Sequence, residues 1–83
     1  MKVLYFAWLR ERLNRSADEF DVPDTVITVG DLLAWIGQND EAAALAFEDP
    51  RLIRAACDEE LVDHSTPIAG VKTIALFPPM TGG

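Results

Sequence analysis

The sequence predicts a small α+β domain in which a mixed sheet packs on one main helix. Two observations predict this class: strand-like runs lie near both ends of the 83-residue chain, and an amphipathic helical segment lies between them. The hydrophobic content of 49% is ample for a core, and a chain of this length is expected to form a single domain. We therefore expect one globular domain over residues 1–77 and an extended, flexible tail over residues 78–83.

The N-terminal segment is expected to form a hairpin with a helical turn in its loop. Residues 2–8 (KVLYFAW) are almost continuously apolar, which predicts a central strand with both faces covered. Leu9 and Leu13 lie four residues apart among polar neighbours, which predicts one or two helical turns. Apolar and acidic residues alternate over 18–22, which predicts a second, half-buried strand.

A capping pattern marks the start of the main helix. Thr28 precedes Asp31 by three residues, as in a capping box, and apolar residues then recur on one helical face, so the main helix is expected over about residues 29–38. Asp40 is expected to cap a second short helix. Pro50 would close that helix, because the residue before a proline avoids the helical region.

Short strands are predicted in the last third of the chain. Residues 52–57 and 60–62 predict two strands, residues 69–70 a turn, and residues 72–77 a returning C-terminal strand. Two antiparallel strands, one packed helix and a returning strand place the helix on one face of the sheet. Among small folds of this kind, a β-grasp accounts best for the order of the elements.

The charge balance argues against several classes of function. Fourteen acidic against seven basic side chains give a formal net charge of −7, whereas nucleic-acid binding needs clustered lysines and arginines. All the acidic side chains lie between Glu11 and Asp63, and they are expected to form solvated surfaces or to dock on a basic partner. The apolar run over residues 3–9 is too short for a membrane span or a signal peptide. We therefore expect a cytoplasmic protein that binds neither nucleic acid nor membrane.

The cysteine and histidine content also limits the chemistry. One cysteine forms no intrachain disulfide, and together with one histidine it cannot complete a four-ligand zinc site, so no metal is expected. We expect Cys57 to be a small core residue rather than a nucleophile. Asp63, His64 and Ser65 have the residue types of a catalytic triad. Because neighbours on an extended chain point to opposite faces, however, a hydrolase is not expected.

The last six residues, PPMTGG, carry no ionisable side chain. The two prolines cannot donate ladder hydrogen bonds and favour an extended exit from the sheet. The two glycines lack Cβ atoms, so a narrow channel of a partner can close around them and leave the terminal carboxylate unshielded. A carboxylate is unreactive as an acyl donor until it carries a leaving group, so this interpretation implies adenylation of Gly83 by ATP on another protein. Two terminal glycines also occur at flexible chain ends that have no chemical role.

Residues 77–83, FPPMTGG, resemble the F-P-P-x-[ST]-G-G terminus of the MoaD family, the small subunit of molybdopterin synthase. The resemblance extends along the chain. Residues 5–11 are similar to the family's F-F-A-x-x-R-E segment, and residues 66–68 are similar to the segment before its last strand. The chain departs from the family at residues 69–73, where an acidic D-G-D-E turn is usual.

This resemblance implies a ubiquitin-like β-grasp sulfur carrier with no permanently bound cofactor. A MoeB-like enzyme would adenylate Gly83 with ATP, a sulfur donor system would convert it to a thiocarboxylate, and a MoaE-like large subunit would receive the tail. Sulfur would then pass to cyclic pyranopterin monophosphate, with the catalytic side chains supplied by the large subunit of a heterotetramer. The residues that thread into the partner would be Pro78, Pro79, Met80, Thr81 and Gly82.

The resemblance also implies a docking surface beside the tail, formed by Phe77, Phe6 and Leu61 with Arg10 at its polar rim. The three apolar residues are alternatively ordinary core residues. Two further functions share the same tail and stay open as alternatives: a carrier for another sulfur pathway, such as that of thiamine, and a ubiquitin-like protein modifier.

Overall fold

The computed structural model describes residues 1–79, so the predicted threading residues Met80, Thr81 and Gly82 and the predicted reactive residue Gly83 lie outside the described part. No helix within residues 1–79 is long and apolar enough to cross a membrane. The elements in chain order are β1 (Lys2–Tyr5), α1 (Trp8–Leu13), β2 (Ala17–Glu19), α2 (Val29–Asn39), α3 (Glu41–Ala46), the 3-10 turn η1 (Pro50–Leu52), β3 (Arg54–Cys57), β4 (Glu60–Val62) and β5 (Thr73–Phe77).

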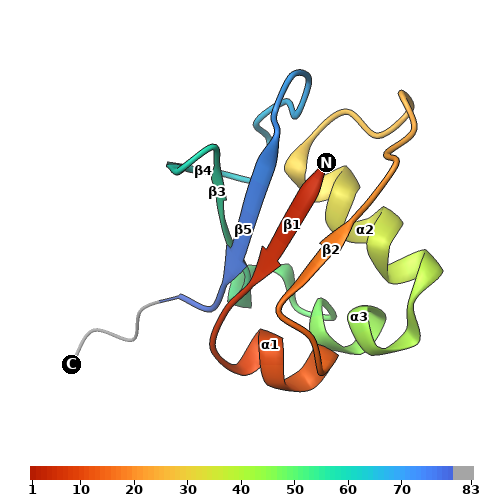
Figure 1. Ribbon diagram of the computed structural model, residues 1–83, viewed down its shortest axis with the longest axis vertical. Helices are drawn as coiled ribbons and strands as arrows, with labels where there is room; N and C mark the ends of the chain where they lie inside the picture. The colour runs from red at the N-terminus through yellow and green to blue at the C-terminus, as the bar shows by residue number, and fades with distance from the viewer. Residues whose placement is uncertain (80–83) are drawn as a thin grey trace.

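The five strands form one mixed sheet with the order β2-β1-β5-β3-β4 (Figure 1). β1 pairs antiparallel with β2 and parallel with β5. β5 also pairs antiparallel with β3, which forms a hairpin with β4. The C-terminal strand therefore lies in the middle of the sheet. The connection between β1 and β2 contains α1, which confirms the predicted hairpin with a helical turn in its loop. This strand order with a packed main helix is a β-grasp, which confirms the predicted fold class.

The core lies between the sheet and the helices. Alternate residues of β1, β3 and β5 point toward α2, whose own apolar residues meet them. Nearly all of these side chains are less than 5% exposed. On the sheet side they are Val3, Tyr5, Ala55, Cys57, Ile74 and Leu76, and on the α2 side they are Val29, Leu32, Leu33 and Ile36.

Both predicted helix caps are present. The Oγ1 of Thr28 accepts a hydrogen bond from the Asp31 amide at 3.1 Å, and the Asp31 carboxylate accepts one from the Thr28 amide at 3.2 Å. The carboxylate of Asp40 accepts hydrogen bonds from the amides of Ala42 and Ala43 at the start of α3. These side chains satisfy amides that have no partner within their own helix.

The first strand is shorter than predicted and has one uncovered face. β1 ends at Tyr5, and Ala7 adopts a left-handed backbone angle (φ 54°, ψ −134°) that turns the chain so that Trp8 begins α1. The aromatic residues in this segment have a high strand propensity, but a helix forms instead because α1 buries two leucines in the core. The side chain of Phe6 is 45% exposed. The predicted central strand is therefore confirmed over Lys2–Tyr5, where it pairs on both sides, but not over residues 6–8, and the expectation that both its faces are covered was wrong.

Other predicted boundaries also differ from the structure. The second strand covers Ala17–Glu19 rather than residues 18–22. The second short helix runs to Ala46 as predicted, but Pro50 does not close it directly and instead begins η1. Because η1 takes residues 50–52, β3 begins at Arg54 rather than at residue 52. None of these differences changes the order of the elements.

Candidate functional site

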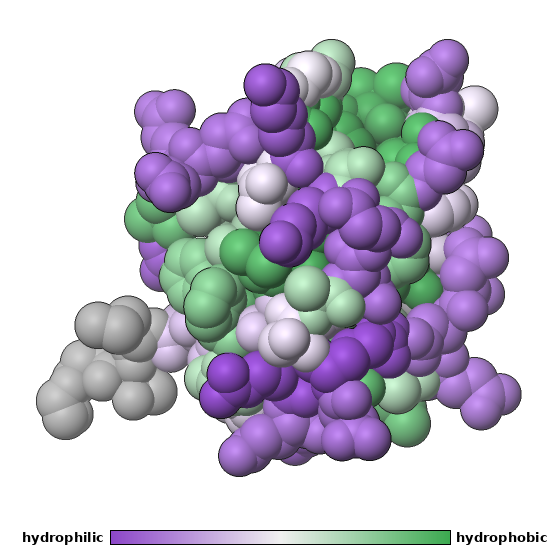
Figure 2. All heavy atoms as spheres, in the orientation of Figure 1, coloured by the Kyte–Doolittle hydropathy of each residue, from purple (hydrophilic) through white to green (hydrophobic). Residues whose placement is uncertain are grey.

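The sheet face opposite the helices carries a continuous apolar surface, which we call the open-face patch. The strand register places Leu4 opposite Ala75, Ala75 opposite Ala56, and Ala56 opposite Leu61, so one apolar row crosses four strands. Phe6 and Phe77 extend the patch toward the end of β5, where the Phe6 amide donates a hydrogen bond to the Leu76 carbonyl at 3.1 Å. Figure 2 shows apolar side chains gathered over β5 and β1, with hydrophilic side chains around them. The patch consists of Leu4, Phe6, Ala56, Leu61, Ala75 and Phe77.

The large side chains of this patch are more exposed to solvent than those of the core. Leu61 is 56% exposed and Phe6 is 45% exposed, whereas Phe77 is half-buried. Neither Leu61 nor Phe6 is an ordinary core residue, because full burial is the rule for core leucine and phenylalanine. Alanines in the middle and larger side chains at the edges leave a shallow surface, a shape that suits a protein partner better than a small ligand. The predicted docking role of these residues stays a prediction.

The chain leaves the sheet at the end of its middle strand. β5 ends at Phe77, and Pro78 and Pro79, which follow it, are half-buried. Neither proline has a backbone N–H to donate to a neighbouring strand, so the strand pairing of β5 ends before them. The point where β5 ends, which we call the tail exit, therefore lies directly beside the open-face patch.

The sequence indicated one cation, Arg10, for the polar rim of the patch. Arg10 is exposed on α1. Sequence reasoning missed Arg54, which lies directly opposite Phe77 in the β3–β5 register and is also exposed. It likewise missed Leu4, Ala56 and Ala75, which complete the patch. The period-two alternation within each strand is the signal that identifies all four residues.

A polar cluster fixes the hairpin and α1 to the start of α3. The Tyr5 hydroxyl donates to the Asp18 carboxylate at 2.8 Å, and Arg15 bonds both to Asp18, at 2.6 Å, and to Asp40. Burial and the hydrogen bond to Asp18 raise the pKa of Tyr5, so its phenol stays protonated at neutral pH. The hydrogen bond from Arg15 and the amides of α3 hold the pKa of Asp40 below its ordinary value. Each polar group is engaged, which indicates a structural role.

The structure also places the other residues that the sequence analysis weighed for a chemical role. Cys57 is 8% exposed, and burial and the nearby charges of Asp58 and Glu60 raise the pKa of its thiol, which makes it a poor nucleophile at neutral pH. The Ser65 hydroxyl bonds to Asp63 at 2.6 Å, whereas the His64 Nε2 donates to the Ile53 carbonyl at 2.7 Å. His64 is therefore turned away from the serine, and the three residues form no triad. Within residues 1–79, no three His, Cys, Asp or Glu side chains gather as a metal site.

Known proteins resemble this chain over its whole length. Residues 3–83 match the ThiS family. The chain is 38% identical over 85 residues to the molybdopterin synthase sulfur carrier subunit of Escherichia coli (strain K12), with 100% of this chain and 99% of the relative covered. It is 30% identical to the subunit of the same name from Haemophilus influenzae, with 100% and 99% covered. Among solved structures, SAMP1 from Haloferax volcanii matches with a TM-score of 0.72 and 28% identity, covering 100% of this chain and 98% of that one.

Proposed function

The chain belongs to the ThiS family, and on that premise we propose that it is the sulfur carrier subunit of a molybdopterin synthase. The observation that carries this proposal is the full-length similarity to curated sulfur carrier subunits, at 38% and 30% identity. The tail exit from the central strand and the adjoining open-face patch support it, because a carrier must present its end to an enzyme while its body docks outside.

The proposed reaction begins at the terminal carboxylate of Gly83. A carboxylate oxygen attacks the α-phosphorus of ATP, pyrophosphate leaves, and an acyl-adenylate forms on a MoeB-like activating enzyme. A sulfide sulfur then attacks the acyl carbon and AMP leaves, which produces the thiocarboxylate. In the synthase this sulfur attacks an oxygen-bearing carbon of cyclic pyranopterin monophosphate, the C–O bond at that carbon breaks, and the oxygen leaves as water or stays with the opened phosphate ester. Water then hydrolyses the acyl–sulfur bond, which restores the Gly83 carboxylate and leaves a thiolate on the pterin. Two loaded carriers supply the two sulfurs of the dithiolene.

The composition of the carrier indicates which chemical groups each subunit supplies to the reaction. The segment from Pro78 to Gly83 has no ionisable side chain, so it brings a reactive terminus but no acid or base. A MoaE-like large subunit therefore supplies the groups that transfer protons during the sulfur transfer. The tail enters its active site, and the two kinds of subunit assemble as a heterotetramer.

The open-face patch is proposed as the surface that docks on both the activating enzyme and the large subunit. Phe6, Leu61 and Phe77 supply its apolar contacts, and Arg10 and Arg54 lie at its polar rim. Large apolar side chains surrounded by polar residues are typical of the residues that dominate binding energy. Because one face serves both partners, the carrier must leave the activating enzyme before it binds the synthase.

Intact-mass measurement tests the central step. The full chain is incubated with a MoeB-like enzyme, ATP and sodium sulfide, and the expected product has one oxygen replaced by one sulfur. Tandem fragmentation should place the sulfur at Gly83. A variant that lacks Gly83 is the matched control and should remain unmodified while keeping its fold by circular dichroism. An unmodified full chain, or molybdopterin synthesis supported by the truncated variant, would contradict the proposal.

The match to the ThiS family favours a second candidate, a carrier that delivers sulfur to a different acceptor. Both candidates predict the same thiocarboxylate, so they are distinguished by reconstitution with a MoaE-like subunit and cyclic pyranopterin monophosphate. Formation of molybdopterin supports the first candidate. A loaded carrier that does not react supports the second, and isopeptide-linked products on lysines would instead indicate a protein modifier.

A further inference from the structure

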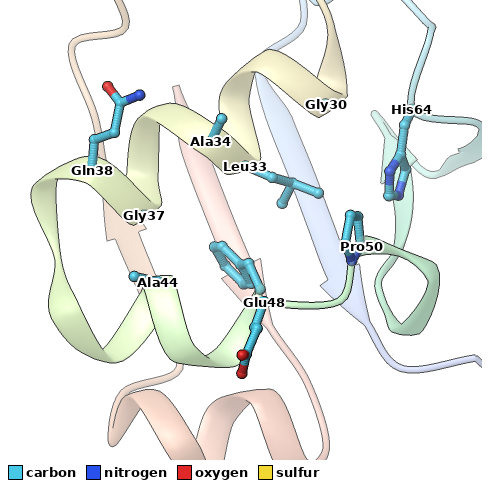
Figure 3. A pocket seen from close by; sticks show the side chains of 10 residues that line it. Gly30, Leu33, Ala34, Gly37, Gln38, Ala44, Glu48, Pro50 and His64 are labelled. Carbon is cyan, nitrogen blue, oxygen red and sulfur yellow. The ribbon is translucent and has the colours of Figure 1, made fainter.

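We propose that the helical side of the domain carries a second docking site, a groove that binds a partner protein segment with bulky apolar side chains flanked by lysine or arginine. The groove has a volume of about 500 Å³ and lies between α2, α3 and the loop that carries His64 (Figure 3). It is on the opposite side of the sheet from the open-face patch. A partner in this groove therefore leaves the open-face patch accessible. The existence of the groove does not depend on the function proposed above.

Small residues create the groove. Gly30, Ala34 and Gly37 recur at intervals of four and three along α2, so they lie on one stripe of the helix. Ala44 lies across from them on α3 (Figure 3). A Cβ atom at Gly37 would lie 3.4 Å from the Cα of Ala44, so the two helices pack closely. With no long side chain along this stripe, the space above it stays unfilled.

The base of the groove is apolar. Leu33 and Phe47 line it and are almost buried, at 4% and 8% exposure. Its polar lining side chains are Gln38, Glu48 and His64, and the Nε2 of His64 is already engaged with a backbone carbonyl. Sites for small molecules combine apolar walls with several convergent polar groups. This groove instead has the character of a receptor for an apolar anchor, as in the binding of an amphipathic helix.

The charge around the groove has one sign. Between Arg15 and Arg51 the sequence contains nine acidic and no basic side chains. Of these acids, Glu48 lines the groove, Asp31 follows Gly30 on α2, and Glu41 begins α3; all three are exposed. The nearby Arg51 is held by Asp49 through two hydrogen bonds of 3.0 Å, so its charge is compensated. An apolar groove with an anionic border fits a segment that carries positive charge beside its apolar anchor.

A peptide titration tests this proposal with the full chain labelled with ¹⁵N. The probe is a short amidated helical peptide with leucines at positions i, i+3 and i+7 among lysines and alanines. We expect saturable shifts confined to α2, α3 and His64, and an affinity that falls roughly tenfold from low to high salt. Peptides with glutamate in place of lysine, or serine in place of leucine, should bind at least about tenfold more weakly.

Two matched variants locate the binding site. Ala34→Arg fills the groove and adds a positive charge, and it should weaken peptide binding at least about tenfold. Ala69→Arg makes the same change at an exposed alanine outside the groove, and it should change the affinity less than about twofold. The proposal is overturned by an absence of saturable shifts, by shifts centred on the open-face patch, by equal binding of the serine or glutamate peptide, or by unchanged binding to Ala34→Arg.

Discussion

The two faces of the sheet are made by the same strands but differ in what they contact. In β5, Ile74 and Leu76 are fully buried against the helices, whereas Ala75 and Phe77 point to the other face and are partly exposed. In β1, Tyr5 is buried and its neighbour Phe6 is 45% exposed. Because strand side chains alternate, one short strand contributes to the stability of the domain and to a surface for a partner.

The largest predicted effect is a difference in the free energy of unfolding between substitutions on the two faces of the sheet. Leu76→Ala removes a fully buried side chain and is expected to lower the free energy of unfolding by about 3 kcal/mol, from lost burial and the cavity left behind. Leu61→Ala makes the same chemical change on the open face, where the side chain is 56% exposed, and should cost less than about 1 kcal/mol. Urea denaturation followed by circular dichroism measures both values. Similar losses for the two variants would contradict the division between the faces.

A second prediction concerns the binding of a partner to the open-face patch. Leu61→Asp should weaken binding to a MoaE-like large subunit by about 2 kcal/mol or more, because a charge would be buried within an apolar contact. Isothermal titration calorimetry measures the affinity.

The control for this binding measurement is Ile27→Asp. Ile27 is 55% exposed, close to the 56% of Leu61, but it lies outside the open-face patch. Its substitution should leave the affinity within about twofold of the unmodified chain. If both variants weaken binding alike, net charge rather than the open-face patch controls the interaction.

A third prediction concerns the polar cluster that supports the covered face. The pKa of Asp40 is lowered in the folded state by Arg15 and the α3 amides. The stabilisation that goes with this shift is therefore complete above the ordinary pKa of 3.8 and is lost as the pH falls through the lowered value. Arg15→Gln should cost about 1 kcal/mol at pH 7, and this difference from the unmodified chain should shrink below about pH 4.

Denaturation measured at several pH values tests this dependence on Arg15. Arg51→Gln is the control, because Arg51 forms its ion pair with Asp49 on an exposed turn. Its stability should match that of the unmodified chain at each pH. A difference between Arg15→Gln and the unmodified chain that is constant with pH would show that Arg15 acts by packing and not through its ion pair with Asp40.

The smallest effect concerns the turn that orients β4 and with it the exposed side chain of Leu61. Glu59 has a φ of 74°, a left-handed conformation that a glycine adopts without strain. Glu59→Gly should therefore raise the free energy of unfolding by about 0.5 kcal/mol. Thermal denaturation measures it, and Glu60→Gly, inside β4, should be destabilising instead. A loss of stability in Glu59→Gly would indicate that its side chain matters more than its backbone angle.

Local patterns predicted the main elements and the caps. The period of apolar residues identified α2, and the spacing of Thr28 and Asp31 identified its start, because both depend on neighbours in the chain. The end of β1 could not be predicted in this way. It depends on the backbone angle of Ala7 and on the burial of Leu9 and Leu13 in a core formed by distant residues.

The candidate site was predicted in part. Residues Phe6, Leu61 and Phe77 came from a resemblance to a family, and the structure shows that they share one sheet face with Leu4. The nearly continuous apolar run at the start of the chain indicated two covered faces. The sequence pattern does not distinguish a face covered within the chain from one that a partner would cover, because both select apolar side chains. The helical groove needs contacts between α2 and α3 that no single segment encodes.

The position of β5 has a mechanical consequence. This strand lies between β1 and β3, with a hydrogen-bonded ladder along each side, and the chain that follows it is the part on which an enzyme would act. A force along the strand from its C-terminal end loads both ladders in shear, so many hydrogen bonds resist together rather than opening one at a time. Tension applied at the C-terminal end of β5 would thus be spread across the sheet, and the folded domain would keep its shape if a partner enzyme pulled on the chain that follows.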